Sequence, residues 1–128
     1  MDVRKQIEYW RTSSDEDFAA AESLLDSGHL RHSLFFAHLA IEKMLKAHIV
    51  CKTKDVPPKI HGLARLGYIG DVAMSKEQRD FLLEFGVYQL EGRYPDSQQM
   101  PLRQAFVKKE LARAKEMLEW LKAQLPRS

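Results

Sequence analysis

The sequence predicts an all-α fold, an up-and-down bundle of four main helices plus one short helix, in a single domain over residues 1–128. Apolar residues recur at three- and four-residue steps along most of the chain, which is the spacing of a helix with one buried face. No stretch alternates apolar and polar residues as a half-buried strand does. The segments between the periodic stretches are short, as they are between neighbouring helices of a bundle.

The first helix is expected from about Val3 to Ser27, with Gly28 as its C-terminal stop. The residues of its inward face recur at helical spacing: Ile7, Trp10, Ser14, Phe18, Ala21 and Leu25. The second helix is expected from about Leu30 to Cys51. It is apolar nearly all round, so it should be the buried central helix of the domain. It should end at residues 52–58, whose two prolines cannot continue a helix.

Three further helices are expected in the second half of the chain. A short one should cover residues 60–68. The segment 75–89 should form the third main helix, because it opens with a capping box, a serine followed three residues later by a glutamine. Residues 92–97, which include glycine and proline, should break this helix. Pro101 suits the first turn of the last main helix, whose apolar residues continue at helical spacing to Leu125.

The composition excludes several classes of protein. A single cysteine excludes an internal disulfide framework and is typical of a reducing cytoplasm. The uncharged run over residues 33–41 is far too short to cross a membrane. The N-terminus has no apolar signal region. We therefore expect a soluble, cytoplasmic protein.

The net charge of +2 is too small to indicate a nucleic-acid partner by itself, but the charge is unevenly distributed. Residues 1–27 carry three Lys/Arg against seven Asp/Glu, and residues 101–128 carry seven against three. Two explanations are open. An acidic first helix could pack beside a basic last helix, or the basic residues could form a groove for phosphates.

Two of the expected helices have more apolar surface than a bundle of this size can cover. One is the central helix, and the other contains residues 81–90, which are apolar on two sides. Uncovered apolar faces of this size usually mark a subunit interface. A homodimer is the simplest way to cover them.

Most enzyme signatures are missing. The glycines match no phosphate-binding loop, and no strand precedes them. Cys51 has no nearby base in the sequence, which favours a structural thiol. The five histidines form no metal-binding motif, and the one acid at ligand spacing, Glu42 after His38, is more typical of a structural pair. We expect neither a metal nor a cofactor.

Three charges lie in the second half of the apolar central helix, where a charge is costly unless it is paired or used. Glu42 precedes Lys46 by one turn, which is the favourable order for an ion pair that stabilises a helix by about 0.3 kcal/mol. Alternatively, the edge formed by Lys43 and Lys46 contacts a phosphate or another subunit.

The loop Arg93-Tyr94-Pro95 and the residue His61 are further candidates. An arginine beside an aromatic ring suits phosphate and base contact, through bidentate hydrogen bonds and stacking. Alternatively, Tyr94 packs on the end of the bundle and Arg93 caps helix carbonyls. For His61, the alternative to a binding role is a hydrogen bond that fixes the loop.

The sequence resembles the HEPN family (higher eukaryotes and prokaryotes nucleotide-binding domain) in residues 36–47, 58–63 and 88–96 and in the pattern of the first and last helices. The resemblance implies an all-helical, usually homodimeric bundle. It also implies a partner, because family members are commonly encoded beside a minimal nucleotidyltransferase and several such pairs act as toxin and antitoxin. The positions that match the family pattern are Glu42, Lys43, Lys46, His61, Arg93, Tyr94 and Pro95.

The chain departs from the family members that cut RNA. Those members carry an arginine followed after four to six residues by a histidine, in a cleft between subunits. After Arg93 the corresponding positions hold Gln98, Gln99 and Met100. A glutamine cannot exchange protons near neutral pH as a metal-free ribonuclease requires.

The sequence therefore predicts a homodimeric, nucleotide-associated binding module that is non-catalytic by itself and acts with a nucleotidyltransferase partner. Lys43, Lys46, His61, Arg93 and Tyr94 are its candidates for binding a nucleotide, RNA phosphate or the partner, and Glu42 and Pro95 give structural support. Two alternatives stay open. One is a metal-independent ribonuclease toxin that uses Arg93 in an inter-subunit cleft, with Tyr94 or His61. The other is a purely structural dimer.

Overall fold

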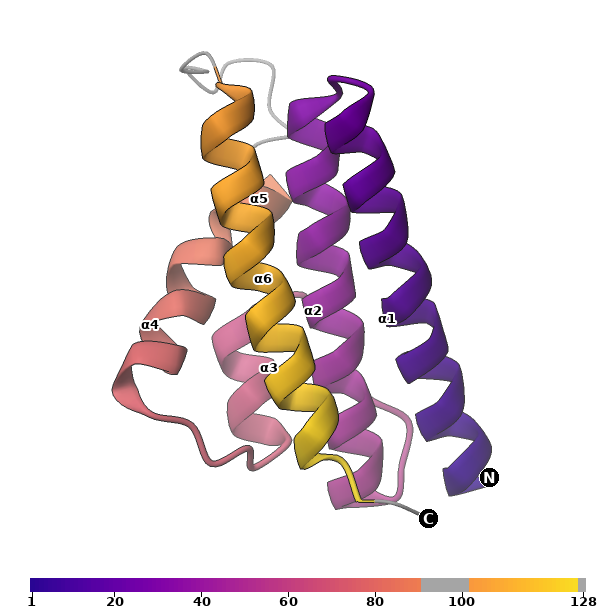
Figure 1. The fold of residues 1–128 in the computed structure, drawn as a ribbon. Helices are drawn as coiled ribbons and strands as arrows, with labels where there is room; N and C mark the ends of the chain where they lie inside the picture. Colours follow the sequence, from indigo (N-terminus) through magenta and orange to yellow (C-terminus); the bar gives the residue numbers. More distant parts are fainter. Residues whose placement is uncertain (91–101, 127–128) are drawn as a thin grey trace.

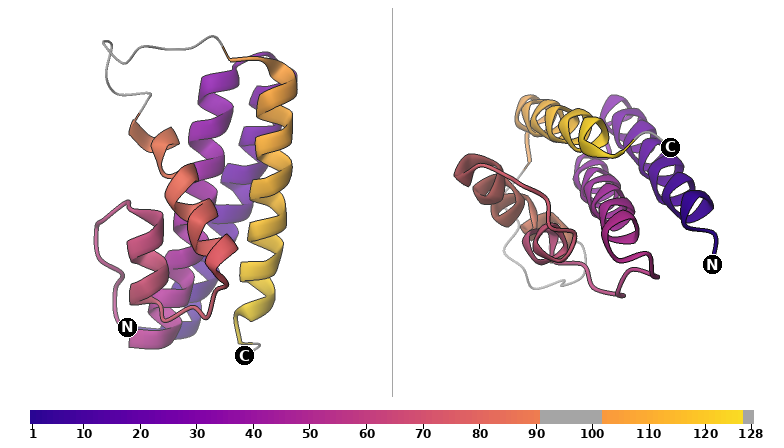
Figure 2. Two further views of the ribbon diagram at one scale, coloured as in Figure 1. Left: turned by 90° about the vertical axis from the view of Figure 1, so that its left-hand side faces the viewer. Right: turned by 90° about the horizontal axis from the view of Figure 1, so that it is seen from below.

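A computed structural model describes residues 1–90 and 102–126 of the chain, and its secondary structure within these ranges is entirely helical. Three long helices lie side by side, and three shorter ones cross one side of them (Figures 1 and 2). The long helices are α1 (Val3–Asp26), α2 (Leu30–Thr53) and α6 (Gln104–Gln124), and the shorter ones are α3 (Leu63–Ile69), α4 (Lys76–Phe85) and α5 (Val87–Leu90). The all-α bundle that the sequence predicts is confirmed.

Local sequence signals set the ends of the first helices and of α4. The side chain of Asp2 caps α1 by accepting a hydrogen bond from the backbone N–H of Lys5 at 3.1 Å. Gly28, after α1, has a φ of 82°, the left-handed conformation that glycine adopts without strain. The capping box of α4 is present, since Ser75 and Gln78 each bond the other's backbone. These ends agree with the prediction.

Helix α2 is the centre of the domain. Most of its residues between Ser33 and Val50 are buried, because α1, α3, α5 and α6 all pack against it. The chain's own helices thus cover most of α2, as expected of the central helix, and leave less of its apolar surface for an interface than the sequence suggested. Phe35, Phe36 and Leu39 stay partly exposed.

Two serine hydroxyls join α1 closely to α2. Ser14 donates from Oγ to the carbonyl of Ala40 at 2.6 Å, and Ser33 donates to the carbonyl of Ala21 at 2.7 Å. All four residues are buried. Small side chains let the two helix backbones approach closely, and the buried hydroxyls find partners in backbone carbonyls.

Side-chain contacts also fix α6 against its neighbours. His48, near the end of α2, donates from Nε2 to the carbonyl of Leu121 at 2.8 Å. Lys122 forms an ion pair with Asp15 of α1 at 2.7 Å. An acidic first helix therefore does pack beside a basic last helix, the first of the two explanations for the uneven charge.

The helix expected over residues 75–89 is interrupted at Gly86, so that α4 and α5 are separate. The Tyr88 hydroxyl in α5 donates to Oε2 of Glu110 in α6 at 2.8 Å, and its ring packs edge-on against Phe85 with the centroids 4.7 Å apart. The first contact joins α5 to α6, whereas the second joins α5 to α4 across the break. Other differences are small: α2 extends to Thr53 and α3 starts at Leu63.

The last helix begins at Gln104, and Pro101, its expected first turn, lies outside the described residues. On the outer side of α4 and α5, Leu83 is 64% exposed and Val87 is 47% exposed. These are apolar residues of the second helix expected to contribute to an interface. Among the described helices, none is long and apolar enough to cross a membrane.

Candidate functional site

A buried ion pair lies in the second half of α2. Glu42 is only 4% exposed and Lys46, one turn later, is 7% exposed. Their charged atoms, Oε2 and Nζ, are 3.2 Å apart. The pairing agrees with the sequence-based account, but the energies typical of surface pairs do not apply here. Removing one member of a buried pair leaves the other charge without a partner in a poorly solvated place.

Glu42 also holds His61, which lies just before α3 and is 19 residues further along the chain. Nδ1 of His61 is 3.1 Å from the same Oε2 atom. A carboxylate accepts hydrogen bonds but cannot donate them, so Nδ1–H is the donor. Nε2 of His61 is therefore the ring nitrogen that is not hydrogen-bonded to Glu42. The imidazole is accessible, since the His61 side chain is 47% exposed while the carboxylate behind it is buried.

Helix α1 completes the surroundings of the pair. The ammonium of Lys46 lies 5.4 Å from the ring centroid of Trp10, within the range of a cation–π interaction. Lys46 thus contacts a carboxylate and an aromatic ring, and both contacts are internal to the domain. Three segments, namely α1, α2 and the loop before α3, therefore meet at this cluster.

His38 lies on the same face of α2, one turn before Glu42, and is fully buried. Its Nδ1 atom is 3.8 Å from Oε1 of Glu42, too far for a hydrogen bond. Burial lowers the pKa of His38 from 6.5 to about 4, more than the nearby carboxylate of Glu42 raises it, and His61 lowers it further. His38 is therefore neutral at pH 7.

Lys43 points to the other side of the cluster, toward α1. Its ammonium is 2.7 Å from Oδ2 of Asp17 and donates to the hydroxyl of Ser13, also at 2.7 Å. Both contacts link α2 to α1. Lys43 and Lys46, whose alternative role was an edge that contacts a phosphate or another subunit, thus each have a partner inside the chain.

The sequence matches the HEPN domain family over residues 7–124, which is nearly the whole chain. The chain belongs to the HEPN domain family. A solved structure described as TT1696 from Thermus thermophilus shares the fold with a TM-score of 0.81 and 18% identity, over 94% of this chain and 98% of that one. At this identity the likeness shows the fold alone. No curated protein matches the sequence.

In this HEPN domain the family-pattern residues fall into two groups. Glu42, Lys46 and His61 meet in the cluster, and Lys43 lies beside it. Arg93, Tyr94 and Pro95 lie outside the described residues, so their roles stay predictions. Within the part of the chain that the structure describes, no group of three or more His, Cys, Asp or Glu residues could hold a metal ion.

Two cations beside His61 were not among the predicted site residues of this HEPN domain. Lys59 and Arg65 are exposed, and neither forms an ion pair within residues 1–90 and 102–126. A Cβ added at Gly62 would lie 3.9 Å from the Cβ of Arg65, which places Arg65 beside the loop that carries His61. The spacing Lys-x-His-x-x-x-Arg over residues 59–65 is the signal that could have identified them.

Proposed function

We propose that this HEPN domain is a non-catalytic, homodimeric module that binds nucleotide or RNA phosphate through His61 and acts with a minimal nucleotidyltransferase partner. The observation that carries the proposal is the half-exposed imidazole of His61 held by the buried carboxylate of Glu42. A fixed side chain loses little entropy when it binds a ligand, so the loop is prepared for binding.

The charges around His61 favour an anionic ligand. Lys59 and Arg65 are exposed on either side of it in the sequence, and we expect them to contact the same phosphate as the imidazole. The buried Lys46 supports the site from behind by holding Glu42 in place. Within this proposal, Arg93 and Tyr94 add a phosphate contact and a stacking surface from the second subunit or from the same one.

One specific observation favours a second candidate function, a metal-independent ribonuclease. A carboxylate that orients a histidine through Nδ1–H is the arrangement that lets Nε2 act as a general base in catalytic triads. Glu42 and His61 have this arrangement. His61 would then accept the proton of a ribose 2′-hydroxyl. It would take the place of the histidine that the RNA-cutting family members carry after their arginine and that this chain lacks after Arg93.

One experiment separates the two functions. The wild type, His61→Ala and the control His32→Ala, which removes an exposed histidine elsewhere on α2, are incubated with a fluorescent RNA oligonucleotide at two salt concentrations. Binding and cleavage are both measured. The binding module predicts no cleavage by any protein, and binding that weakens about tenfold in His61→Ala alone. Binding should also weaken as salt rises.

The outcomes are distinct. Cleavage by the wild type and the control that disappears in His61→Ala would establish the ribonuclease. Equal binding by all three proteins, without cleavage, would exclude His61 from the site. An Arg93→Ala variant in the same assays tests the arginine loop independently.

The homodimer rests on the exposed apolar side chains of α4 and α5, Leu83 and Val87. We expect light scattering to give a dimer mass at micromolar concentration, and Leu83→Glu to shift it toward the monomer. Val56→Glu is the matched control, because Val56 is equally exposed but lies in the loop after α2. A monomer mass for the wild type at all concentrations would refute the dimer.

A further inference from the structure

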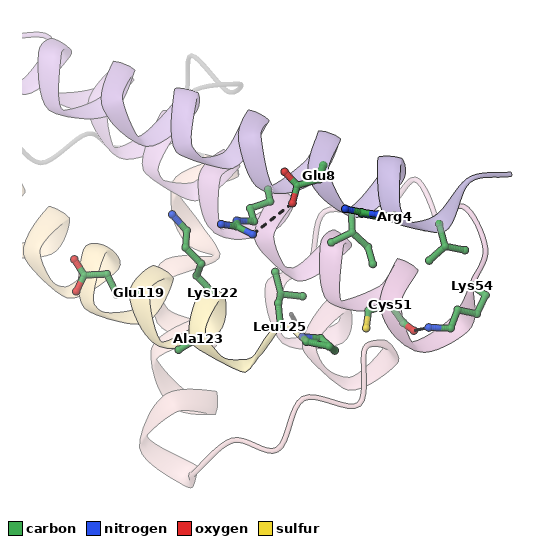
Figure 3. A pocket seen from close by; sticks show the side chains of 12 residues that line it. Arg4, Glu8, Cys51, Lys54, Glu119, Lys122, Ala123 and Leu125 are labelled. Atoms are coloured by element: carbon green, nitrogen blue, oxygen red, sulfur yellow. Dashed lines mark hydrogen bonds and ion pairs between the residues drawn. The ribbon is translucent and has the colours of Figure 1, made fainter. Parts of the chain in front are cut away.

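A cavity of about 1090 Å³ lies at one end of the bundle, between the first turns of α1 and the ends of α2 and α6 (Figure 3). Its volume is at the upper end of the range of small-molecule sites in proteins. None of the residues that line it belongs to the Glu42, Lys46 and His61 cluster. It is therefore a separate feature of the domain.

The wall of the cavity combines an apolar surface with charged groups. Its apolar lining comes from Val3 and Ile7 of α1, Cys51 near the end of α2 and Leu125 after α6. Apolar side chains of α1, of α2 and of the residue after α6 thus line a volume that the core does not fill and that is open to solvent on one side. Half of the lining residues are charged, so a ligand that fits here combines an apolar part with a charged group.

The charged groups favour an anion. Four cations line the cavity against two acids: Arg4, Arg11, Lys54, Lys122, Glu8 and Glu119. Lys122 is paired with Asp15, and Lys54 donates to the carbonyl of Cys51 at 2.7 Å. The pair between Arg11 and Glu8 is long, 3.4 Å, and exposed.

Arg4 differs from the other three cations. It forms no hydrogen bond or ion pair with any described residue, and it lies one turn from Ile7 on the side of α1 that lines the cavity. A guanidinium without a partner beside an apolar cavity can bind a carboxylate or phosphate group through two parallel hydrogen bonds. The apolar part of the same molecule would then contact Ile7 and Leu125.

We propose that this cavity binds a small amphipathic anion, a molecule with one carboxylate or phosphate group and an apolar chain or ring. Arg4 binds the anionic group, and the apolar wall between α1, α2 and α6 holds the rest. The proposal is independent of the phosphate site at His61.

Cys51 provides a direct readout, because it is the chain's single cysteine and it lines the cavity. The probe is decanoate below its micelle concentration, with decanol as the uncharged analogue. Alkylation of Cys51 by the neutral reagent iodoacetamide is followed by mass spectrometry. We expect decanoate to slow alkylation in a saturable way, and decanol to bind about tenfold more weakly because it lacks the charge.

Two substitutions test the assignment of Arg4. Arg4→Glu should weaken protection by decanoate about tenfold or more. Lys5→Glu is the matched control, because it makes the same change of charge on an exposed neighbour that does not line the cavity. Its protection should stay within about twofold of the wild type. Ala123→Trp, at an exposed position of the wall, should fill the cavity and lower the alkylation rate without any probe.

The proposal is overturned if decanoate gives no saturable protection of the wild type, or if Arg4→Glu and Lys5→Glu lose protection equally. Equal protection by decanol and decanoate would overturn the anionic part of the assignment. Thermal unfolding of each variant confirms that it is folded before its protection is compared.

Discussion

Replacing His38 by leucine tests the buried face of α2 most directly. His38 is fully buried, and neither of its ring nitrogens has a hydrogen-bond partner among the described residues. The titratable groups that face it are Glu42 on its own helix and His61 from the loop before α3. Leucine has a similar size and does not titrate. At pH 7.5 we expect the variant to be at least as stable as the wild type, because an unpaired polar group is removed.

The main effect should appear in mild acid. Burial lowers the pKa of His38 from 6.5 to about 4, so the unfolded chain binds a proton in a pH range where the folded protein does not. The free energy of unfolding therefore falls as the pH falls from 6.5 to 4. Each tenfold change in proton affinity corresponds to about 1.4 kcal/mol, so the full loss from His38 is roughly 3 kcal/mol.

Urea unfolding at a series of pH values between 7.5 and 4 measures this loss. The wild type should lose roughly 3 kcal/mol more than His38→Leu over the range. The control is His32→Leu, which removes an exposed histidine of α2 and should keep the acid dependence of the wild type. Some acid dependence should remain in His38→Leu, because burial also lowers the pKa of His48, against the effect of its hydrogen bond to Leu121.

Parallel curves for the wild type and His38→Leu would refute the reasoning. They would mean that His38 is protonated as readily in the folded protein as in the unfolded chain, and that its burial does not control its charge. A variant curve that lies lower than that of the wild type at pH 7.5 but falls less steeply toward pH 4 would show a packing defect in addition to the expected loss of titration.

The remaining substitutions concern stability alone. Lys46→Met should lower the free energy of unfolding by about 3 kcal/mol in a urea titration, because Glu42 stays buried without its ion pair. The control is Lys76→Met, which removes an exposed ion pair with Asp80. An equally large effect of Lys76→Met would contradict the role of burial. Leu45→Ala should lower the free energy of unfolding by about 3 kcal/mol, because Leu45 is fully buried. A change in the thermal midpoint too small to resolve would refute full burial. Gly28→Ala should cost about 1 kcal/mol by calorimetry, because of the positive φ of this residue. A neutral result would show that the turn relaxes.

Helical spacing and end signals were enough to predict the long helices from the sequence. The break at Gly86 was not predicted, because the apolar spacing continues through it; in the structure Tyr88, just after the break, contacts Glu110, 22 residues away. Local patterns carry no information about such a partner. The same limit applies to the expected uncovered face of α2, since how much of a helix its neighbours cover depends on the whole arrangement.

The candidate site was predicted in part. The Glu42–Lys46 pair follows from one-turn spacing, but its burial and its contact with His61 depend on how the loop before α3 returns to α2. The resemblance to the HEPN family selected these positions without indicating which is exposed. The structure adds that distinction, since His61 is accessible and Lys46 is not.

The hydroxyl contacts between α1 and α2 also bear on the order in which the fold forms. Ser33 and Ala21 are 12 residues apart, whereas His48 and Leu121, which join α2 to α6, are 73 apart. Closing the shorter loop costs less chain entropy, and α1 with α2 forms the most extensive helix pair of the described residues. This hairpin can therefore form early and recruit α6 later.

Refolding and unfolding rates should then depend on different contacts. Ser33→Ala should slow refolding, while His48→Gln should mainly accelerate unfolding, and stopped-flow measurements over a range of urea concentrations distinguish the two. The reverse assignment would show that α6 docks first. We therefore expect the α1–α2 contacts to set how fast the native state is reached, and the last turn of α6 to set how long it persists.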